Sequence, residues 1–419
     1  MRNPITDLVE QANRFANAGR MQDAERTWGE VRRLDPNHPK ALFSLGFHAL
    51  HRGDASGAVA LLVAARAVAP RDMVTLLTLA GAHAQAGDAP AAREAIEAAL
   101  AVDPYFIPAL LAKAGWFERF GTRLAAANTY RNVMRIAPPE SHWPANLRPQ
   151  LEHARKVVEA HANSYGRYLA ERLKAAQSAL PASLAGRWRE ASAIMAGLSK
   201  PFVSDSNQLY VPRLPAIPFF DRDQFPWIPA LEAQTDVIRA ELLAALQNDR
   251  ERFSPYIAYK PGEPVNQWQE LNHSLRWSTL ALWRGGEPVR ENLDRCPETA
   301  RALEQVEMAQ IGGLCPNAMF SALAPKTRIP PHHGETNARL VAHLPLIVPD
   351  HCLFRVGFEE RPWRVGEVMV FDDTLEHEAR NDSDELRVVL IFDVWNPLLS
   401  TAEHEIINAM VAAAREFAG

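Results

Sequence analysis

Small and apolar residues recur at a fixed spacing through the first third of the chain. The period is 34 residues, and three residue types keep it in register over four units. They are the prolines Pro36, Pro70, Pro104 and Pro138, the glycines Gly19, Gly53, Gly87 and Gly121, and the alanines Ala24, Ala58, Ala92 and Ala126. A register kept by three residue types predicts four copies of one structural unit.

Each unit is expected to form two helices. The first helix begins around Leu8, Leu42, Leu76 and Leu110. The glycine lets the chain reverse, the alanine permits close helix approach, and the proline follows the second helix, which it cannot continue. Residues 5–138 thus resemble the tetratricopeptide repeat, whose units stack into a superhelix with a concave groove. We expect this array to dock a peptide or protein partner, or else only to scaffold or dimerise the second domain.

A boundary is expected near residue 200. Residues 147–199 keep apolar positions at a spacing of three and four, which predicts further helix that caps the array. After Pro201 the composition of the chain changes, and the stretch YVPRLPAIPFFDRDQFPWIP is rich in proline and aromatic residues. We therefore expect a repeat array over residues 1–140, a helical cap and linker over 141–200, and a second domain over 201–419.

The second domain contains short β-rich runs from about residue 315 onward. They are AMFSALA, ARLVAHLPLIV, CLFRVGF, VGEVMVFDD and LRVVLIFDVW, separated by proline, glycine and acidic turns. This spacing favours an antiparallel sandwich or barrel, and a double-stranded β-helix (a jelly roll, as in cupins) is the natural candidate. The expected fold class is α+β multidomain, with a helical solenoid followed by this barrel.

Composition excludes several classes of protein. Of 419 residues, 47% are hydrophobic and 23% charged, as in ordinary globular proteins. The net charge of -5 does not indicate the excess of basic residues that is typical of nucleic-acid-binding proteins. Cys296, Cys315 and Cys352 are widely spaced, which favours neither a disulfide framework nor a structural zinc site. Because no run of about 18 apolar residues is present, we expect no membrane segment and a cytoplasmic location.

Polar residues fall on the predicted strands where a barrel would otherwise carry apolar ones. They are Ser321, His332, Asn337, Arg339, His343, His377 and Arg387. His332, at the expected start of a strand, and His377, after FDDTLE, are distant in sequence, but inside a barrel they can meet and bind a first-row metal through neutral imidazoles. Arg387, on the next and final strand, can pair with the distal carboxylate of a 2-oxoacid that chelates this metal. Each residue alone is typical of ordinary packing; their combination indicates a site.

Three segments carry a resemblance to a known family. They are PHHGETNARLVAHL, VFDDTLEHEARND and LRVVLIFDVWNP. These segments resemble the aspartyl/asparaginyl β-hydroxylases, which are Fe(II)- and 2-oxoglutarate-dependent dioxygenases. The resemblance covers about residues 205–398 and is most specific over 330–397.

The resemblance implies a role for each polar residue. His332 and His377 would bind iron, Arg387 with Ser321 would hold the distal carboxylate of 2-oxoglutarate, and His343 would contact the carboxylate near the metal. Asn337 and Arg339 would lie on the substrate side. Two positions after Arg339 the family usually has a second arginine, whereas this chain has Val341. This departure leaves the substrate class open.

The third metal ligand has two interpretations. Most oxygenases of this kind place a carboxylate two residues after the first histidine, but Gly334 follows His332 at that distance. Water would then complete the shell, as the resemblance implies. Shifting by one residue makes His333 the ligand and Glu335 the carboxylate. The ungapped match at Ser321, Asn337 and Arg339 favours His332, and Asp372 and Asp373 are expected to cap a turn.

The expected function is hydroxylation of an unactivated carbon, foremost the β-carbon of an Asp or Asn residue in a peptide or protein. Hydroxylation of a lipid acyl chain is an alternative, because lipid hydroxylases share these motifs. A repeat-based interaction protein with a catalytically silent barrel is the alternative from another class. The joint presence of His332, His377 and Arg387 argues against silence.

Overall fold

A computed structural model describes residues 4–418, and the chain separates into two compact units. The first reaches to Lys174 and includes Met195–Leu198, and the second comprises Ala175–Ile194 and Ser199–Gly419.

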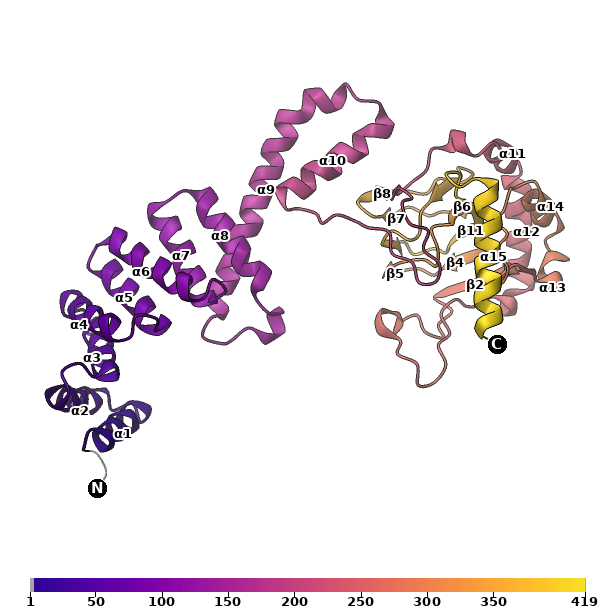
Figure 1. Cartoon of the computed structure of the whole chain (residues 1–419). Coiled ribbons are helices and arrows are strands. Elements are labelled where there is room, and N and C mark those ends of the chain that lie inside the picture. Colours follow the sequence, from indigo (N-terminus) through magenta and orange to yellow (C-terminus); the bar gives the residue numbers. More distant parts are fainter. Residues whose placement is uncertain (1–3, 419) are drawn as a thin grey trace. The chain divides into compact units, whose positions relative to one another are not determined.

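The first unit begins with eight helices that form four successive antiparallel pairs (Figure 1). They are α1 (Pro4–Asn17), α2 (Met21–Leu34), α3 (Pro39–His51), α4 (Ala55–Val68), α5 (Met73–Gln85), α6 (Ala89–Val102), α7 (Ile107–Phe120) and α8 (Arg123–Ile136). Each repeating proline lies just after the second helix of its pair, at the position predicted from its inability to continue a helix. The helical repeat array predicted from the 34-residue period is confirmed.

Small residues allow the helices of each pair to approach closely. Ala12, Ala80 and Ala114 are buried on the first helices, and Gly46 holds the same position in α3. A Cβ at Gly46 would lie 2.7 Å from Cγ of Leu62, so a larger residue would push α3 away from α4. Three of the four repeating turn glycines have positive φ, between 74° and 85°, which explains why the chain reverses there at glycine.

Two further helices follow the repeats. They are α9 (Arg148–Ser178) and α10 (Ala182–Ala196). The helical structure predicted for residues 147–199 is therefore present, and it is interrupted before Pro181. Proline restricts the preceding residue to extended conformations, which accounts for the end of α9 there.

The second unit contains two antiparallel sheets. The larger sheet has the order β1-β2-β4-β11-β6-β9, with β3 paired to β2, and the smaller has the order β5-β10-β7-β8. The strands are β1 (Ser254–Pro255), β2 (Trp277–Arg284), β3 (Glu287–Pro288), β4 (Ala318–Leu323), β5 (Thr327–His332), β6 (Arg339–Ile347), β7 (Cys352–Val356), β8 (Glu359–Arg361), β9 (Met369–Phe371), β10 (His377–Asn381) and β11 (Arg387–Trp395).

The two sheets enclose one apolar core and the larger one carries helices on its other face. Val341 and Val389 of the larger sheet pack in one cluster with Phe354 and Ala379 of the smaller one. A second cluster joins the opposite face of the larger sheet to the helices (Figure 1). The helices that follow α10 in this unit are α11 (Ile228–Glu232), α12 (Thr235–Asn248), α13 (Arg290–Leu293), α14 (Pro297–Glu304) and α15 (Thr401–Ala418), and α15 packs in a separate cluster through Ile407. The β-rich runs predicted from the sequence all contain strands.

The structure corrects two expectations about this unit. His332 ends β5 rather than beginning a strand, and β5 and β10 were not among the predicted runs. Arg387 begins β11, which belongs to the larger sheet and does not pair with β10. Arg387 therefore approaches the two histidines from the opposite sheet, because β5 and β10 belong to the smaller sheet and β11 belongs to the larger one.

Candidate active site

A cavity of about 700 Å³ opens between the two sheets. Six of the seven polar residues singled out in the sequence line it: Ser321, His332, Arg339, His343, His377 and Arg387. The remaining wall is largely aromatic and aliphatic, and includes Trp268, Trp277, Trp363 and Phe371. Such a cavity, in which apolar walls bring polar groups together, is typical of small-molecule and catalytic sites.

His332 and His377 meet within this cavity. They are direct partners in the β5–β10 register, and their ring centroids lie 4.0 Å apart. His332 donates from Nδ1 to the carbonyl of Pro330 at 2.8 Å, and His377 donates from Nδ1 to the carbonyl of Leu375 at 3.0 Å. Because each Nδ1 carries the proton, the Nε2 lone pair of each ring is left available, as in metal-binding histidines.

Both rings are neutral at physiological pH. Burial, reinforced by the neighbouring His377, lowers the pKa of His332 to about 3. Burial also lowers the pKa of His377 to about 4. Neutral imidazole is the form that coordinates a metal.

The adjacent His333 and Glu335 have other contacts. His333 donates from Nδ1 to the carbonyl of Thr374 at 2.8 Å. Glu335 accepts from Nε2 of Gln208 at 3.2 Å and is 41% exposed. Both line the cavity, but a ring contact with His377 is found for His332 and not for His333 within residues 4–418. This geometry favours the His332–His377 pair.

Gly334 leaves room for the carboxylate of Asp373. A Cβ at position 334 would overlap that carboxylate. The position two residues after His332 therefore cannot carry a side chain while Asp373 keeps its place. Asp373 itself is buried and lines the cavity, so the expectation that it merely caps a turn is wrong, whereas Asp372 does accept from the backbone of Thr374 at 2.9 Å.

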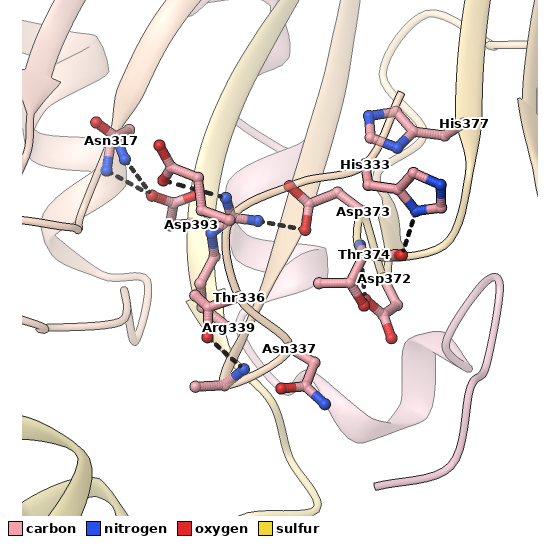
Figure 2. A network of polar contacts seen from close by, with 12 residues as sticks. Asn317, His333, Thr336, Asn337, Arg339, Asp372, Asp373, Thr374, His377 and Asp393 are labelled. Atoms are coloured by element: carbon pink, nitrogen blue, oxygen red, sulfur yellow. Dashed lines mark hydrogen bonds and ion pairs between the residues drawn. The ribbon is translucent and has the colours of Figure 1, made fainter. Parts of the chain in front are cut away.

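Arg339 lies between two buried carboxylates (Figure 2). Its Nη1 is 2.6 Å from Oδ1 of Asp373 and its Nε is 3.2 Å from Oδ1 of Asp393. Asp393 also accepts at Oδ2 from the backbone N–H of Asn317 at 2.7 Å. Asp393 was not among the residues singled out in the sequence. An acid inside the apolar run VVLIFDVW is nevertheless expected to be buried and therefore to pair with a cation or a hydrogen-bond donor.

Arg387 is a buried cation that has no carboxylate partner among residues 4–418. It is 2% exposed, its Nε has no hydrogen-bond partner, and its Nη1 donates only to the carbonyl of Ser321 at 3.4 Å. The guanidinium lies over the ring of Trp363, 4.6 Å from its centroid. Burial lowers the pKa of Arg387 to about 10, so it is charged at neutral pH. An uncompensated buried guanidinium facing a cavity is suited to bind an anion.

Two indoles orient the remaining polar groups. Trp277 donates from Nε1 to the hydroxyl of Ser321 at 3.1 Å, which leaves the Ser321 O–H free to donate. Trp363 donates from Nε1 to Nδ1 of His343 at 3.2 Å. Burial lowers the pKa of His343, so its ring is neutral and must carry its proton on Nε2.

Asn337 does not line the cavity. Its side chain accepts from the backbone N–H of Val211 at 2.7 Å and donates to the Val211 carbonyl at 2.8 Å. Both ends of the amide are thus used to hold residues 207–211 against the segment after β5. The expected place of Asn337 on the substrate side is corrected to a structural one.

The donor set fits a metal held by two imidazoles. No cluster of three or more His, Cys, Asp or Glu residues suited to a metal occurs in the part of the chain that the structure describes. The two unbonded Nε2 atoms nevertheless meet the chemical requirement for a first-row metal site whose other positions are open. Arg387, in the same cavity, can hold the carboxylate of a chelating ligand.

The paired sheets, the cavity and this constellation have the features of an enzyme. The family model for aspartyl/asparaginyl β-hydroxylase matches residues 232–397. The ornithine lipid ester-linked acyl 2-hydroxylase of Rhizobium tropici is 33% identical over 204 residues, which cover 48% of this chain and 68% of that protein. The chain belongs to the aspartyl/asparaginyl β-hydroxylase family, whose members are hydroxylases.

Animal relatives match over the same region. The human aspartate β-hydroxylase domain-containing protein 2 is 30% identical, covering 52% of this chain and 58% of that protein. The human aspartyl/asparaginyl β-hydroxylase is 31% identical, covering 44% of this chain and 23% of that protein. The chain thus spans only part of the animal proteins.

The helical repeats are similar to solved structures at low scores. MamA 41-end from Desulfovibrio magneticus RS-1 is 26% identical with a TM-score of 0.31, covering 32% of this chain and 76% of that chain. At that score the likeness carries no argument beyond the helix pairs themselves. Within residues 4–418, no helix combines the length and apolarity needed to cross a bilayer.

Proposed function

We propose that the chain is an Fe(II)- and 2-oxoglutarate-dependent dioxygenase that hydroxylates an unactivated carbon. The observation that carries this proposal is the pair of neutral imidazoles with free Nε2 atoms, in one cavity with the unpaired guanidinium of Arg387. We further propose that the two sheets form a double-stranded β-helix, which the alternation of strands between them supports.

Each polar residue has a role in this proposal. His332 and His377 would hold the iron, Arg387 with Ser321 would bind the distal carboxylate of 2-oxoglutarate, and His343 would donate from Nε2 to its other carboxylate. Bound iron with 2-oxoglutarate and dioxygen would supply the oxidising power that breaks a C–H bond. With Gly334 in place of a carboxylate residue, solvent would complete the coordination shell.

The protein orients these groups before any ligand binds. The Nδ1 bonds of His332 and His377 to backbone carbonyls fix both the tautomer and the ring orientation. Trp277 and Trp363 do the same for Ser321 and His343. The aromatic wall limits water in the cavity, which strengthens each charge interaction there.

The substrate carbon is foremost the β-carbon of an Asp, Asn or related residue of a polypeptide, and the helical repeats would recruit that polypeptide. A lipid acyl chain is the second candidate. It is favoured by the match to the Rhizobium acyl 2-hydroxylase and by the apolar wall that Val341, Ile391 and Phe371 contribute.

Anaerobic addition of Fe(II) and 2-oxoglutarate tests the cofactor assignment. We expect weak metal-to-ligand absorption in the green, lost in His377→Ala and retained in Glu335→Ala. A folded protein that gives no absorption would favour a silent barrel. Loss of the absorption in Glu335→Ala but not in His332→Ala would instead favour His333 and Glu335 as ligands.

Deleting residues 1–140 tests the role of the repeats. We expect conversion of 2-oxoglutarate to succinate without substrate to be unchanged, while turnover stimulated by a protein substrate is lost. Equal stimulation with and without the repeats would contradict recruitment by this array.

A further inference from the structure

The surroundings of Arg339 contain more negative than positive charge. Three carboxylates lie within 4 Å of its guanidinium: Asp373 at 2.6 Å, Asp393 at 3.2 Å and Glu335 at 3.8 Å. All four residues line the cavity. One cation therefore faces three acids on this wall, and Arg339 is already neutralised by its two closest partners (Figure 2).

Acceptor atoms on this wall remain unused. Oδ1 of Asp373 lies 2.6 Å from Nη1 of Arg339, but the two atoms form no hydrogen bond of normal geometry, although the Asp373 side chain is only 8% exposed. Glu335 is too far from Arg339 for a hydrogen bond and is 41% exposed toward solvent. A ligand that brings N–H donors to this wall would satisfy acceptors that the protein leaves open.

The other cations of the cavity do not reverse this balance. Arg387 lies under Trp363 and is assigned to 2-oxoglutarate in the proposed function. Arg284 is exposed at the end of β2, where solvent screens its charge. Val341, two residues after Arg339 on β6, also lines the cavity and adds no charge.

We propose that the substrate group bound beside Arg339 is a nitrogen donor, an ammonium in preference to an amide, and that Glu335 is its acceptor. This inference rests on the proposed function, since it concerns the substrate of the same site, and it narrows that function from an Asp residue to a residue whose side chain carries an amide or an ammonium. Glu335 is then a specificity-determining residue. A carboxylate in this position would meet a surplus of negative charge and would bring no further donor to Glu335, which selects against acidic side chains.

Three matched peptides test this charge preference. N-acetylated, C-amidated Ala-X-Ala probes carry aspartate, asparagine or 2,4-diaminobutyrate at X, so the side chain changes charge at similar size. Binding at pH 7 to the full chain is followed by the fluorescence of Trp268, Trp277 and Trp363, which line the cavity. We expect the diaminobutyrate probe to bind at least ~10-fold more tightly than the aspartate probe, with asparagine between them.

Two variants locate the preference and one serves as the control. Glu335→Gln should reduce the difference between the probes several-fold, and Val341→Arg should invert it in favour of aspartate. Arg284→Gln, which removes a solvated cation at the rim, should leave the order unchanged. Equal binding of the three probes, a preference for aspartate in the unaltered protein, or an order that depends on Arg284 would overturn the inference.

The outcome is separable from that of the proposed function. Binding of 2-oxoglutarate with Fe(II) is measured on the same preparations under anaerobic conditions. Normal cofactor binding without a charge preference overturns the inference alone. A charge preference in a protein that binds no 2-oxoglutarate overturns the proposed function and leaves the acidic wall as a binding site for nitrogen donors.

Discussion

His332 and His377 face each other across the register of β5 and β10, with ring centroids 4.0 Å apart and each Nδ1 bonded to a backbone carbonyl. In the part of the chain that the structure describes, neither Nε2 atom has a hydrogen-bond partner in the protein. This relationship ties local strand geometry to metal chemistry, because the tautomer of each ring is fixed by its own backbone.

Replacing either histidine by alanine should abolish metal binding. We expect His332→Ala and His377→Ala to weaken Fe(II) or Co(II) binding by more than about 100-fold, the upper limit for loss of a partner that only orients a ligand. Isothermal titration under anaerobic conditions measures this. His333→Ala is the matched control and should bind metal within about threefold of the unaltered protein, because His333 is neither a ligand nor a partner that orients one. Equal losses in all three variants would contradict the assignment.

Replacing Arg387 by methionine should stabilise the ligand-free protein. The pKa of about 10, well below the ordinary value for arginine, corresponds to roughly 3 kcal/mol of burial penalty. This exceeds the ~1–2 kcal/mol expected from its contact with Trp363. The penalty is present below pH 10 and is relieved at higher pH, where the native state loses the proton first.

Urea denaturation at pH 7 should therefore give a free energy of unfolding about 1–2 kcal/mol higher for Arg387→Met. The same variant should lose the stabilisation that 2-oxoglutarate confers on the unaltered protein. A large destabilisation without ligand would show that the cation has a compensating partner.

Replacing Asn337 by alanine should affect stability rather than substrate binding. The variant leaves the N–H and the carbonyl of Val211 without their partners, which costs about 2–3 kcal/mol in the free energy of unfolding. Asn207→Ala, which removes one bond at an exposed site, should cost about 0.5 kcal/mol or less. An unchanged stability of Asn337→Ala, combined with weaker substrate binding, would restore the role predicted from the sequence.

A methyl group at Gly334 should disturb the acidic wall of the cavity, which Glu335, Asp373 and Asp393 form around Arg339. In Gly334→Ala the new Cβ overlaps the carboxylate of Asp373, so that side chain must move away from Arg339. We expect the free energy of unfolding to fall by about 2 kcal/mol or more, because the buried ion pair is disrupted. Gly312→Ala, where no heavy atom lies within 4 Å of the added Cβ, is the control and should change stability by less than about 1 kcal/mol. Thermal unfolding compares the two.

Enlarging a small residue in the repeats should destabilise that array. Ala58 is 0% exposed in α4, and Ala58→Leu should cost about 1–3 kcal/mol through overpacking. Ala60, on the exposed side of the same helix, accepts leucine with little change. Unfolding followed by circular dichroism at 222 nm, a wavelength dominated by helix, measures the effect. Equal responses would mean that the 34-residue register does not mark the packed face.

Part of the site was predictable because it depends on spacing and residue type. Arg387 stands out in a run that is otherwise apolar, His332 and His377 stand out as histidines in the segments that carry the family resemblance, and the structure brings all three to one cavity. Asp373 was misjudged because turn residues and cavity residues look alike in sequence. Asn337 was misjudged for the converse reason, since a buried amide that holds a backbone segment has the same residue type as one that binds substrate.

The sequence by itself determined the helical repeats, since a 34-residue period of small residues, turn glycines and prolines specifies each helix pair through local contacts. The sequence also identified six of the polar residues that line the cavity, among them His332, His377 and Arg387. Only the tertiary structure decided that β5 and β10 pair, that β11 lies in the other sheet, and that Arg339 is held between Asp373 and Asp393. These relationships join residues far apart along the chain, and strand alternation alone leaves both register and sheet order free.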